Sequence, residues 1–346
     1  MRRFTTIAAL ALLLWSAAAG CAGTHRPRAT FQGPERGGPT LTAQDPRSVK
    51  FVGLTRISSG AVGDDLFPAP LPHGGGVIFS SDRHSHSLKL YLEEDGKAGA
   101  LRLTRGEGND IQATVAPQGG EVVFASDRDG QWRLYRLSDL GGSSDPQAIT
   151  DPELTALHPS FDPSGERICY MRRSPQGRWE VWIHTLADGT ERFICEGLFP
   201  EFHPKKDRLI VQRARDRDAR WYSLHLVDLA LGRERELVAG ADWGAVNPSF
   251  HPDGTWIVFN SVREKSSDDA HPEHGDDLWC MTEDGRRLTR LTETARAEWN
   301  PVWGRDGQIY FTATDRERAG IWRMTPRLPE SPQNQGAPAM LGMGTP

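Results

Sequence analysis

The chain has 346 residues and a formal net charge of −5 at pH 7, with 41 basic and 46 acidic side chains. This near balance argues against a nucleic-acid-binding protein, because such proteins usually present a strongly basic face. The chain contains 36 glycines and 24 prolines and has no long stretch with a helical apolar period, so we expect many short strands joined by tight turns.

The first 20 residues have the features of a signal peptide. Residues 2 and 3 are arginines, and residues 7–15 form an apolar run of nine residues. That run is much shorter than the stretch of about 20 residues that spans a bilayer. We therefore expect residues 1–20 to be a targeting segment that is absent from the mature protein.

The segment Ala-Ala-Gly-Cys at residues 18–21 resembles the lipobox of bacterial lipoproteins. In that family the cysteine becomes the acylated N-terminus, so the resemblance implies attachment to a membrane through Cys21. Ala22 is not the aspartate associated with retention in the inner membrane, and the resemblance therefore implies the outer membrane, facing the periplasm. An ordinary secretory signal followed by a chance cysteine is the alternative.

Residues 21–49 are rich in Gly, Pro, Arg and Thr and have almost no apolar content before Val49. Such a composition does not bury enough apolar surface to fold. We expect this segment to be a flexible tether from the lipidated Cys21 to a folded domain over residues 50–325. The tail, residues 326–346, has the same character and is expected to be disordered.

Six related segments follow along residues 68–316. Each has a large apolar residue, a turn rich in Pro, Asp or Gly, a β-branched or aromatic run, and a second polar turn. The segments are PAPLPHGGGVIFSSDR (68–83), ATVAPQGGEVVFASDR (113–128), PSFDPSGERICYMRR (159–173), PEFHPKKDRLIVQRA (200–214), PSFHPDGTWIVFNSVR (248–263) and PVWGRDGQIYFTATDR (301–316). Their aromatic or valine anchors are separated by 41 to 52 residues. A repeat of this length made of strands and turns predicts an all-β fold, a β-propeller with six four-stranded blades.

The last repeat ends near residue 325 with only three predicted strands. Residues 50–57 contain the Leu-Thr ending that closes the other repeats. We therefore predict that this N-terminal strand completes the last blade and closes the ring. Three cysteines lie in the repeats without metal-site spacing, and we expect buried free thiols at Cys169, Cys195 and Cys280.

On this repeated sequence pattern, the chain resembles the six-bladed propeller domain of TolB and related periplasmic propeller repeats over about residues 50–325. Members of this class generally bind protein partners at the mouth of the central channel. The resemblance implies a scaffold for an envelope protein of unknown identity. We also expect a monomer without a cofactor, and the balanced charge argues against a nucleic-acid partner. The chain departs from TolB in having only 28 residues between Cys21 and the propeller and in its predicted lipid anchor.

One repeat position predicts a ring of side chains at the channel. His158, Asn247 and Asn300 each precede a proline at the start of a predicted innermost strand, and the other repeats place Phe67, Gln112 and Phe199 there. Because innermost strands of a propeller surround the channel, polar groups from several blades should converge near one of its ends. The candidate partner- or ligand-binding residues are therefore His158, Asn247, Asn300 and Gln112, with solvated strand ends as the structural alternative.

Two other groups of residues have weaker functional readings. Residues 265–277 form an insertion with several carboxylates, in which His271 and His274 could bind a divalent metal, although charged loops are usually only solvated. The recurring Asp-Arg pairs at 82–83, 127–128 and 315–316 are expected to organise turns by accepting backbone hydrogen bonds.

The sequence contains neither a G-x-S-x-G nucleophile motif nor a phosphate-binding loop, and no catalytic residue is predicted. We therefore expect a protein-interaction scaffold rather than an enzyme. The alternative is a carbohydrate-binding or polysaccharide-lyase-type propeller that uses the channel mouth. Metal-dependent depolymerisation of an acidic polysaccharide would distinguish the two.

Overall fold

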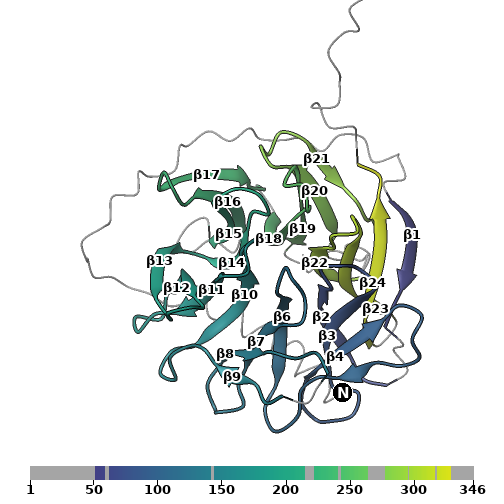
Figure 1. The fold of residues 1–346 in the computed structure, drawn as a ribbon. Coiled ribbons are helices and arrows are strands. Elements are labelled where there is room, and N and C mark those ends of the chain that lie inside the picture. Colours follow the sequence, from purple (N-terminus) through teal and green to yellow (C-terminus); the bar gives the residue numbers. More distant parts are fainter. Residues whose placement is uncertain are drawn as a thin grey trace, which may run out of the picture.

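The computed structural model describes residues 51–58, 62–141, 144–214, 222–240, 243–263, 277–294, 296–315 and 318–328. Within these ranges, 24 strands form six antiparallel four-stranded sheets, which are arranged as blades around a centre (Figure 1). The predicted six-bladed propeller is confirmed. No helix that could cross a membrane occurs in this part of the chain.

The first three blades follow the chain from their innermost to their outermost strand. Blade 1 contains β2 (Asp65–Pro70), β3 (Gly76–Ser81), β4 (Lys89–Glu94) and β5 (Leu101–Arg102). Blade 2 contains β6 (Asp110–Val115), β7 (Val122–Ser126), β8 (Arg133–Leu137) and β9 (Gln147–Ala148). Blade 3 contains β10 (Ala156–Phe161), β11 (Arg167–Arg173), β12 (Trp179–Thr185) and β13 (Glu191–Glu196).

The last three blades continue in the same order, except at the end of the ring. Blade 4 contains β14 (Leu198–Phe202), β15 (Arg208–Ala214), β16 (Tyr222–Asp228) and β17 (Arg233–Val238). Blade 5 contains β18 (Trp243–Phe250), β19 (Trp256–Arg263), β20 (Leu278–Thr282) and β21 (Leu288–Arg290). Blade 6 contains β22 (Glu298–Trp303), β23 (Ile309–Asp315), β24 (Arg318–Pro326) and β1 (Phe51–Arg56).

The N-terminal strand β1 closes the ring as predicted. It pairs antiparallel with β24, from Phe51 opposite Pro326 to Arg56 opposite Trp322, so the two ends of the folded chain lie side by side (Figure 1). Beyond the strand, the hydroxyl of Ser58 accepts a 2.9 Å hydrogen bond from the backbone N–H of Ile321. The blade that would otherwise have a free outer edge is therefore complete.

The apolar core lies in the seams between neighbouring blades. The six anchor positions that define the sequence repeat are all at most 1% exposed: Phe79, Phe124, Tyr170, Val211, Phe259 and Phe311. One cluster joins Phe79 of blade 1 to Tyr310 and Ile321 of blade 6. Because both faces of a blade are covered by neighbours, the second strands show continuous rather than alternating burial, as in β3 and β7.

The turns between the first two strands of each blade also touch across seams. Gly254 has φ +77°, and a Cβ there would contact the ring of His203 from blade 4. Gly165 has φ +78°, and a Cβ there would lie 2.6 Å from Oε1 of Gln118 in blade 2. Glycine is therefore favoured at both turns by the backbone conformation, and at Gly254 also by the neighbouring ring of His203.

Cys169, Cys195 and Cys280 are buried free thiols, as expected. Cys169 and Cys195 belong to one apolar cluster with Val181, which lies on the strand between them. Burial raises the pKa of the Cys195 thiol to about 12, which keeps it protonated and unreactive at neutral pH.

Candidate functional site

The predicted ring residues share an unusual backbone conformation. Phe67, Gln112, His158, Phe199, Asn247 and Asn300 all have φ between 46° and 55°, and they are the non-glycine residues with positive φ in the described part of the chain. Each lies where the pairing register of an innermost strand shifts against its second strand. L-residues rarely adopt this region, so every blade carries the same strained bulge at the same place.

These bulges lie within the innermost strands. The strands begin one to four residues before the ring position, as in β10, which starts at Ala156, and β22, which starts at Glu298. The sequence had placed the start of the strand at the following proline. The ring residues therefore lie within the innermost strands, at the second to the fifth residue of each strand, and not directly before them.

All six blades contribute to one small cavity at this level. Its volume is about 70 Å³, and its lining includes Phe67, Gln112, His158, Glu201, Asn247 and Asn300. A buried water needs roughly 10–15 Å³ of such space, so the cavity holds a few water molecules or one small polar group. The structure thus brings together all four candidate binding residues named from the sequence.

Hydrogen bonds couple the ring side chains in pairs. Asn247 Nδ2 donates to Asn300 Oδ1 at 2.9 Å and to Asn260 Oδ1 at 3.2 Å. Gln112 Oε1 accepts a 3.1 Å hydrogen bond from the backbone N–H of His158. Two buried atoms, His158 Nδ1 and Asn247 Oδ1, have no hydrogen-bond partner among the described residues. Such atoms are the ones that a bound polar group would satisfy.

Glu201 is a cavity residue that the sequence reasoning missed. Its carboxyl accepts hydrogen bonds from the backbone N–H of Phe250 at 2.7 Å and from the hydroxyl of Ser249 at 3.2 Å. Burial raises its pKa to about 8 despite these hydrogen bonds. A signal was present, because Glu201 occupies a repeat position where the other blades carry Ala, Thr, Ser or Val.

The cavity is electrically neutral at neutral pH. Glu201 holds its proton because its pKa is about 8, whereas burial lowers the pKa of His158 to about 4 and keeps the imidazole uncharged. The His158 ring packs edge-on against Phe199, with 4.8 Å between ring centroids. This arrangement offers hydrogen-bond donors and acceptors in an apolar frame, which suits a neutral polar group better than an ion.

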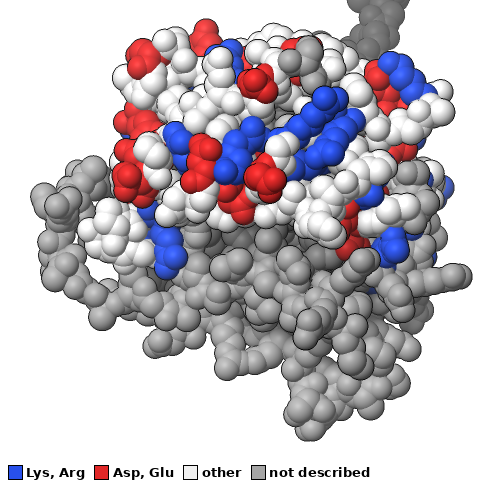
Figure 2. Space-filling view, turned by 90° about the horizontal axis from the view of Figure 1, so that it is seen from below, with Lys and Arg blue, Asp and Glu red and all other residues white. Residues whose placement is uncertain are grey.

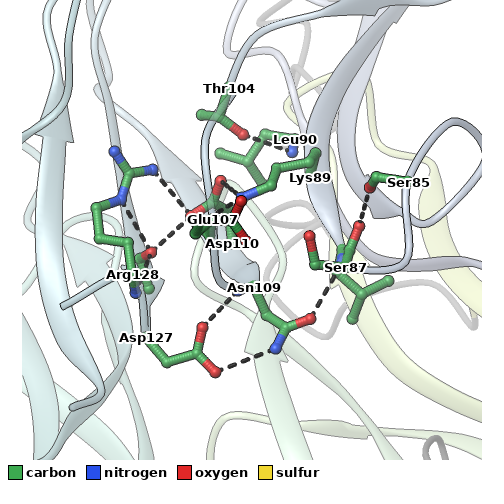
Figure 3. A network of polar contacts seen from close by, with 12 residues as sticks. Ser85, Ser87, Lys89, Leu90, Thr104, Glu107, Asn109, Asp110, Asp127 and Arg128 are labelled. Atoms are coloured by element: carbon green, nitrogen blue, oxygen red, sulfur yellow. Dashed lines mark hydrogen bonds and ion pairs between the residues drawn. The ribbon is translucent and has the colours of Figure 1, made fainter. Parts of the chain in front are cut away.

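The Asp-Arg pairs of blades 1 and 2 are structural, as expected. A carboxylate oxygen of Asp82 accepts a 2.8 Å hydrogen bond from the backbone N–H of Asp64, and Asp127 accepts the equivalent bond from Asn109. Arg128 donates to buried Asp110 at 3.0 Å, and Figure 3 shows both parts of this network. The third pair, at residues 315–316, has side chains outside the described residues.

The other sequence candidates do not join the cavity. His203 is buried against Phe250, and His251 packs edge-on against Trp303, both at the turns between first and second strands. His271 and His274 lie outside the described residues. The described ranges contain no group of three or more His, Cys, Asp or Glu side chains arranged to hold a metal ion.

The outer surface of the ring shows acidic and basic side chains interspersed on the face seen in Figure 2. Exposed pairs of opposite charge also occur, such as Arg178 with Glu196 and Lys97 with Glu94. Mixed surface charge of this kind favours solubility and does not create a long-range field of one sign.

No protein-family model matches the chain. Among curated proteins, an uncharacterised protein of Agrobacterium fabrum is 26% identical over 190 residues, which cover 53% of this chain and 60% of that protein. An uncharacterised peptidase of Bacillus subtilis is 28% identical over 205 residues, which cover 58% of this chain and 29% of the peptidase. The chain therefore matches less than two thirds of the length of either relative.

Solved structures share the fold more completely. TolB proteins of Agrobacterium tumefaciens and Acinetobacter baumannii both superpose with a TM-score of 0.58, at 15% and 17% identity. The first match covers 80% of this chain and 97% of that TolB, and the second covers 70% and 57%. An oligogalacturonate lyase of Vibrio parahaemolyticus superposes with a TM-score of 0.56 at 11% identity, covering 82% of this chain and 95% of the lyase.

These likenesses confirm the resemblance to TolB-like propellers at the level of the fold. A fold of this kind carries many functions, and function depends on the site built upon it. Because a lyase and a peptidase stand among the similar proteins, the expectation that the chain is not an enzyme is not confirmed.

Proposed function

We propose that this chain is a lipid-anchored propeller of the cell envelope that binds a protein partner at the mouth of its central channel. The observation that carries the proposal is the neutral polar cavity to which all six blades contribute. The TolB-like fold supports it, because the resemblance to TolB implies a ring that binds a protein partner at its channel mouth.

The chemistry of the cavity limits what a partner inserts there. With a volume of about 70 Å³, the space accepts one small uncharged polar tip, such as an amide or a hydroxyl. That tip would hydrogen-bond to His158 Nδ1 and Asn247 Oδ1, which have no partner among the described residues. The rest of the interface lies on the strand ends and loops around the channel mouth.

The partner is identified by cross-linking in the native envelope followed by mass spectrometry. We expect one envelope protein to be captured by the unmodified chain and lost from the double variant His158→Ala, Asn300→Ala. His73→Ala is the matched control, because His73 is exposed at a turn, where its Nε2 lies 3.3 Å from the carbonyl oxygen of Gln118. Equal capture by the double variant and the control would exclude docking through the channel.

The membrane anchor has a separate test. In the proposal, residues 1–20 are removed and Cys21 carries the acyl chains, each buried methylene of which contributes about 0.8 kcal/mol to membrane binding. We expect mass spectrometry of the mature protein to show an acylated N-terminal cysteine and Cys21→Ser to move the protein to the soluble fraction. A mature protein that starts elsewhere would refute the anchor and leave the docking proposal standing.

A second candidate function is cleavage or binding of an acidic oligosaccharide. The observation that favours it is the similarity of the fold to an oligogalacturonate lyase over 95% of that enzyme. A second oligogalacturonate lyase of similar fold is known in complex with manganese. Incubation of the full chain with oligogalacturonate and manganese would reveal cleavage of the polysaccharide by the appearance of unsaturated products. Metal-dependent cleavage that is lost in His158→Ala would establish this function in place of the scaffold.

A further inference from the structure

The seam between blades 1 and 2 contains a fully buried ion pair. Lys89 Nζ donates to Asp110 Oδ2 at 3.2 Å and to the carbonyl oxygen of Glu107 at 3.0 Å (Figure 3). The side chains of Lys89 and Asp110 are both 0% exposed. An acid on the innermost strand of one blade is thus neutralised by a lysine on the third strand of the preceding blade.

The seam between blades 5 and 6 has the same framework with different residues. In blade 1 the N–H of Leu90 donates to Thr104 Oγ1 at 2.9 Å, and in blade 5 the N–H of Leu278 donates to Thr292 Oγ1 at 2.9 Å. The residue before each leucine is therefore equivalent, which places Asp277 where blade 1 has Lys89. Glu298 follows its threonine by the same number of residues as Asp110 and starts the innermost strand in the same way.

The seam between blades 5 and 6 therefore contains two buried acids, at the positions where the seam between blades 1 and 2 has an acid and a lysine. Glu298 is 2% exposed and Asp277 is 7% exposed. Arg290 donates to Asp277 Oδ2 at 2.7 Å, and the hydroxyl of Thr294 donates to Glu298 Oε1 at 3.0 Å. The remaining oxygens, Asp277 Oδ1 and Glu298 Oε2, are buried and have no hydrogen bond of ordinary geometry among the described residues. The hydroxyl of Thr292 lies near the Glu298 carboxyl, and the backbone N–H of Thr294 lies near the Asp277 carboxyl.

The two carboxyl groups of this seam differ in their partners. Arg290 forms an ion pair with Asp277 at 2.7 Å, whereas Glu298 accepts a hydrogen bond from the neutral hydroxyl of Thr294. A buried carboxylate without a cation beside it is destabilising, and a cation in contact with both acids would offset that penalty.

We propose that the seam between blades 5 and 6 binds a divalent cation between Asp277 and Glu298, in the place that the Lys89 ammonium occupies between blades 1 and 2. Hard divalent cations such as calcium take carboxylate, hydroxyl and water oxygens as ligands. Asp277 Oδ1 and Glu298 Oε2 supply the charged ligands, and water completes the coordination. The site joins the innermost strand of blade 6 to the third strand of blade 5, so the cation would stabilise the ring. This proposal is independent of the proposed function.

The test measures thermal unfolding of the full chain after chelator treatment, at about pH 8, where Glu298 is largely ionised. We expect calcium chloride at about 1 mM to raise the midpoint temperature of the unmodified chain. Glu298→Gln should abolish this rise. Asp277→Lys should raise the midpoint temperature without calcium and remove the response to calcium, because it recreates the Lys89–Asp110 arrangement. In this variant Arg290 can turn toward the carbonyl oxygen of Thr292, as Arg102 does toward that of Thr104.

Two control variants locate the effect. Asp129→Asn removes an exposed acid that pairs with Arg133, and His271→Ala with His274→Ala removes the histidines of the insertion. Both should keep the calcium response. Loss of the response in the histidine variant would assign the cation to His271 and His274 and overturn the proposal.

Calorimetric titration of calcium into the folded chain gives a readout that does not depend on unfolding. We expect one binding event in the unmodified chain that is absent from Glu298→Gln. An equal response of the unmodified chain and Glu298→Gln, or no binding in either, would refute the site. If lowering the pH stabilised the folded chain and calcium had no effect, Asp277 and Glu298 would share a proton instead of a cation, and the proposal would be wrong.

Discussion

At the scale of single residues, environment decides the charge state of the groups that line the channel. His158 and Glu201 are both uncharged at neutral pH, because burial lowers the pKa of His158 and raises the pKa of Glu201. A glutamate at the surface would be ionised at neutral pH. The cavity is therefore neutral and lined by hydrogen-bonding groups, although its lining includes an acid and a base.

The first prediction concerns Glu201. Its pKa is about 8 in the folded chain and near 4.5 in the unfolded chain, so the folded state binds the proton more tightly. The free energy of unfolding should therefore fall as pH rises through this window, by an amount on the order of a few kcal/mol.

Glu201→Gln keeps the shape and removes the titration. We expect chemical denaturation to show a smaller loss of stability between mildly acidic and alkaline pH than in the unmodified chain. The part of the loss that remains includes the contribution of Glu298, whose pKa is also raised. An unchanged pH profile in Glu201→Gln would show that Glu201 is already ionised in the folded state.

A second prediction at this scale concerns the turn glycines. Gly254→Ala places a Cβ at φ +77° against the ring of His203, whereas Gly96→Ala has φ +76° and no atom within 4 Å of the new Cβ. Both variants carry the backbone penalty of about 1 kcal/mol, but only Gly254→Ala adds the collision. Denaturation should show a clearly larger loss of stability for Gly254→Ala, and equal losses would mean that His203 moves aside freely.

At the scale of elements, each blade is a repeated four-stranded unit whose strands and turns can be predicted from the sequence. The turn glycines, the apolar second strands and the ring position before proline recur at nearly constant spacing. The repeat predicted the number of blades, the closing strand and the convergence of His158, Asn247 and Asn300 on one cavity. It misplaced the start of the innermost strands, because proline marks the bulge rather than the strand end.

The third prediction concerns the closing strand β1. Deletion of residues 50–57 removes the pairing with β24 and the 2.9 Å hydrogen bond from the backbone N–H of Ile57 to the carbonyl oxygen of Ile321. We expect a markedly lower midpoint of thermal unfolding, because blade 6 then has a free edge and the ring an open seam. Val52→Ala is the control, since Val52 is 39% exposed and its truncation should change little. A deletion variant that melts like the intact chain would disprove the stabilising role of closure.

At the scale of the whole molecule, the seams between blades determine stability, and they are not equivalent. Blades 1 and 2 meet through a buried Lys89–Asp110 pair, whereas the seam between blades 5 and 6 contains the buried acids Asp277 and Glu298, of which Asp277 pairs with Arg290. Apolar clusters fill the rest of these seams. The six blades are therefore similar in backbone structure, but the charged contacts differ from one seam to another.

The fourth prediction concerns this pair. Lys89→Met leaves Asp110 Oδ2 without its cation, although Arg128 still donates to Asp110 Oδ1. Breaking a buried pair by removing one partner costs about 3 kcal/mol. Lys97→Met is the matched control, because Lys97 pairs with Glu94 at the surface and should contribute under about 1 kcal/mol. Denaturant titration of both variants gives the comparison, and similar small losses would show that the buried pair adds no net stability.

The sequence by itself determined the class of fold, the number of blades, the closure and which residues form the ring, because strand, turn and repeat signals depend on residues close together in the chain. Tertiary structure alone revealed that Glu201 faces the same cavity as His158 and that Asp277 lies across from Glu298. These contacts join different blades. Their charge states follow from burial between blades, which no local pattern of residues encodes.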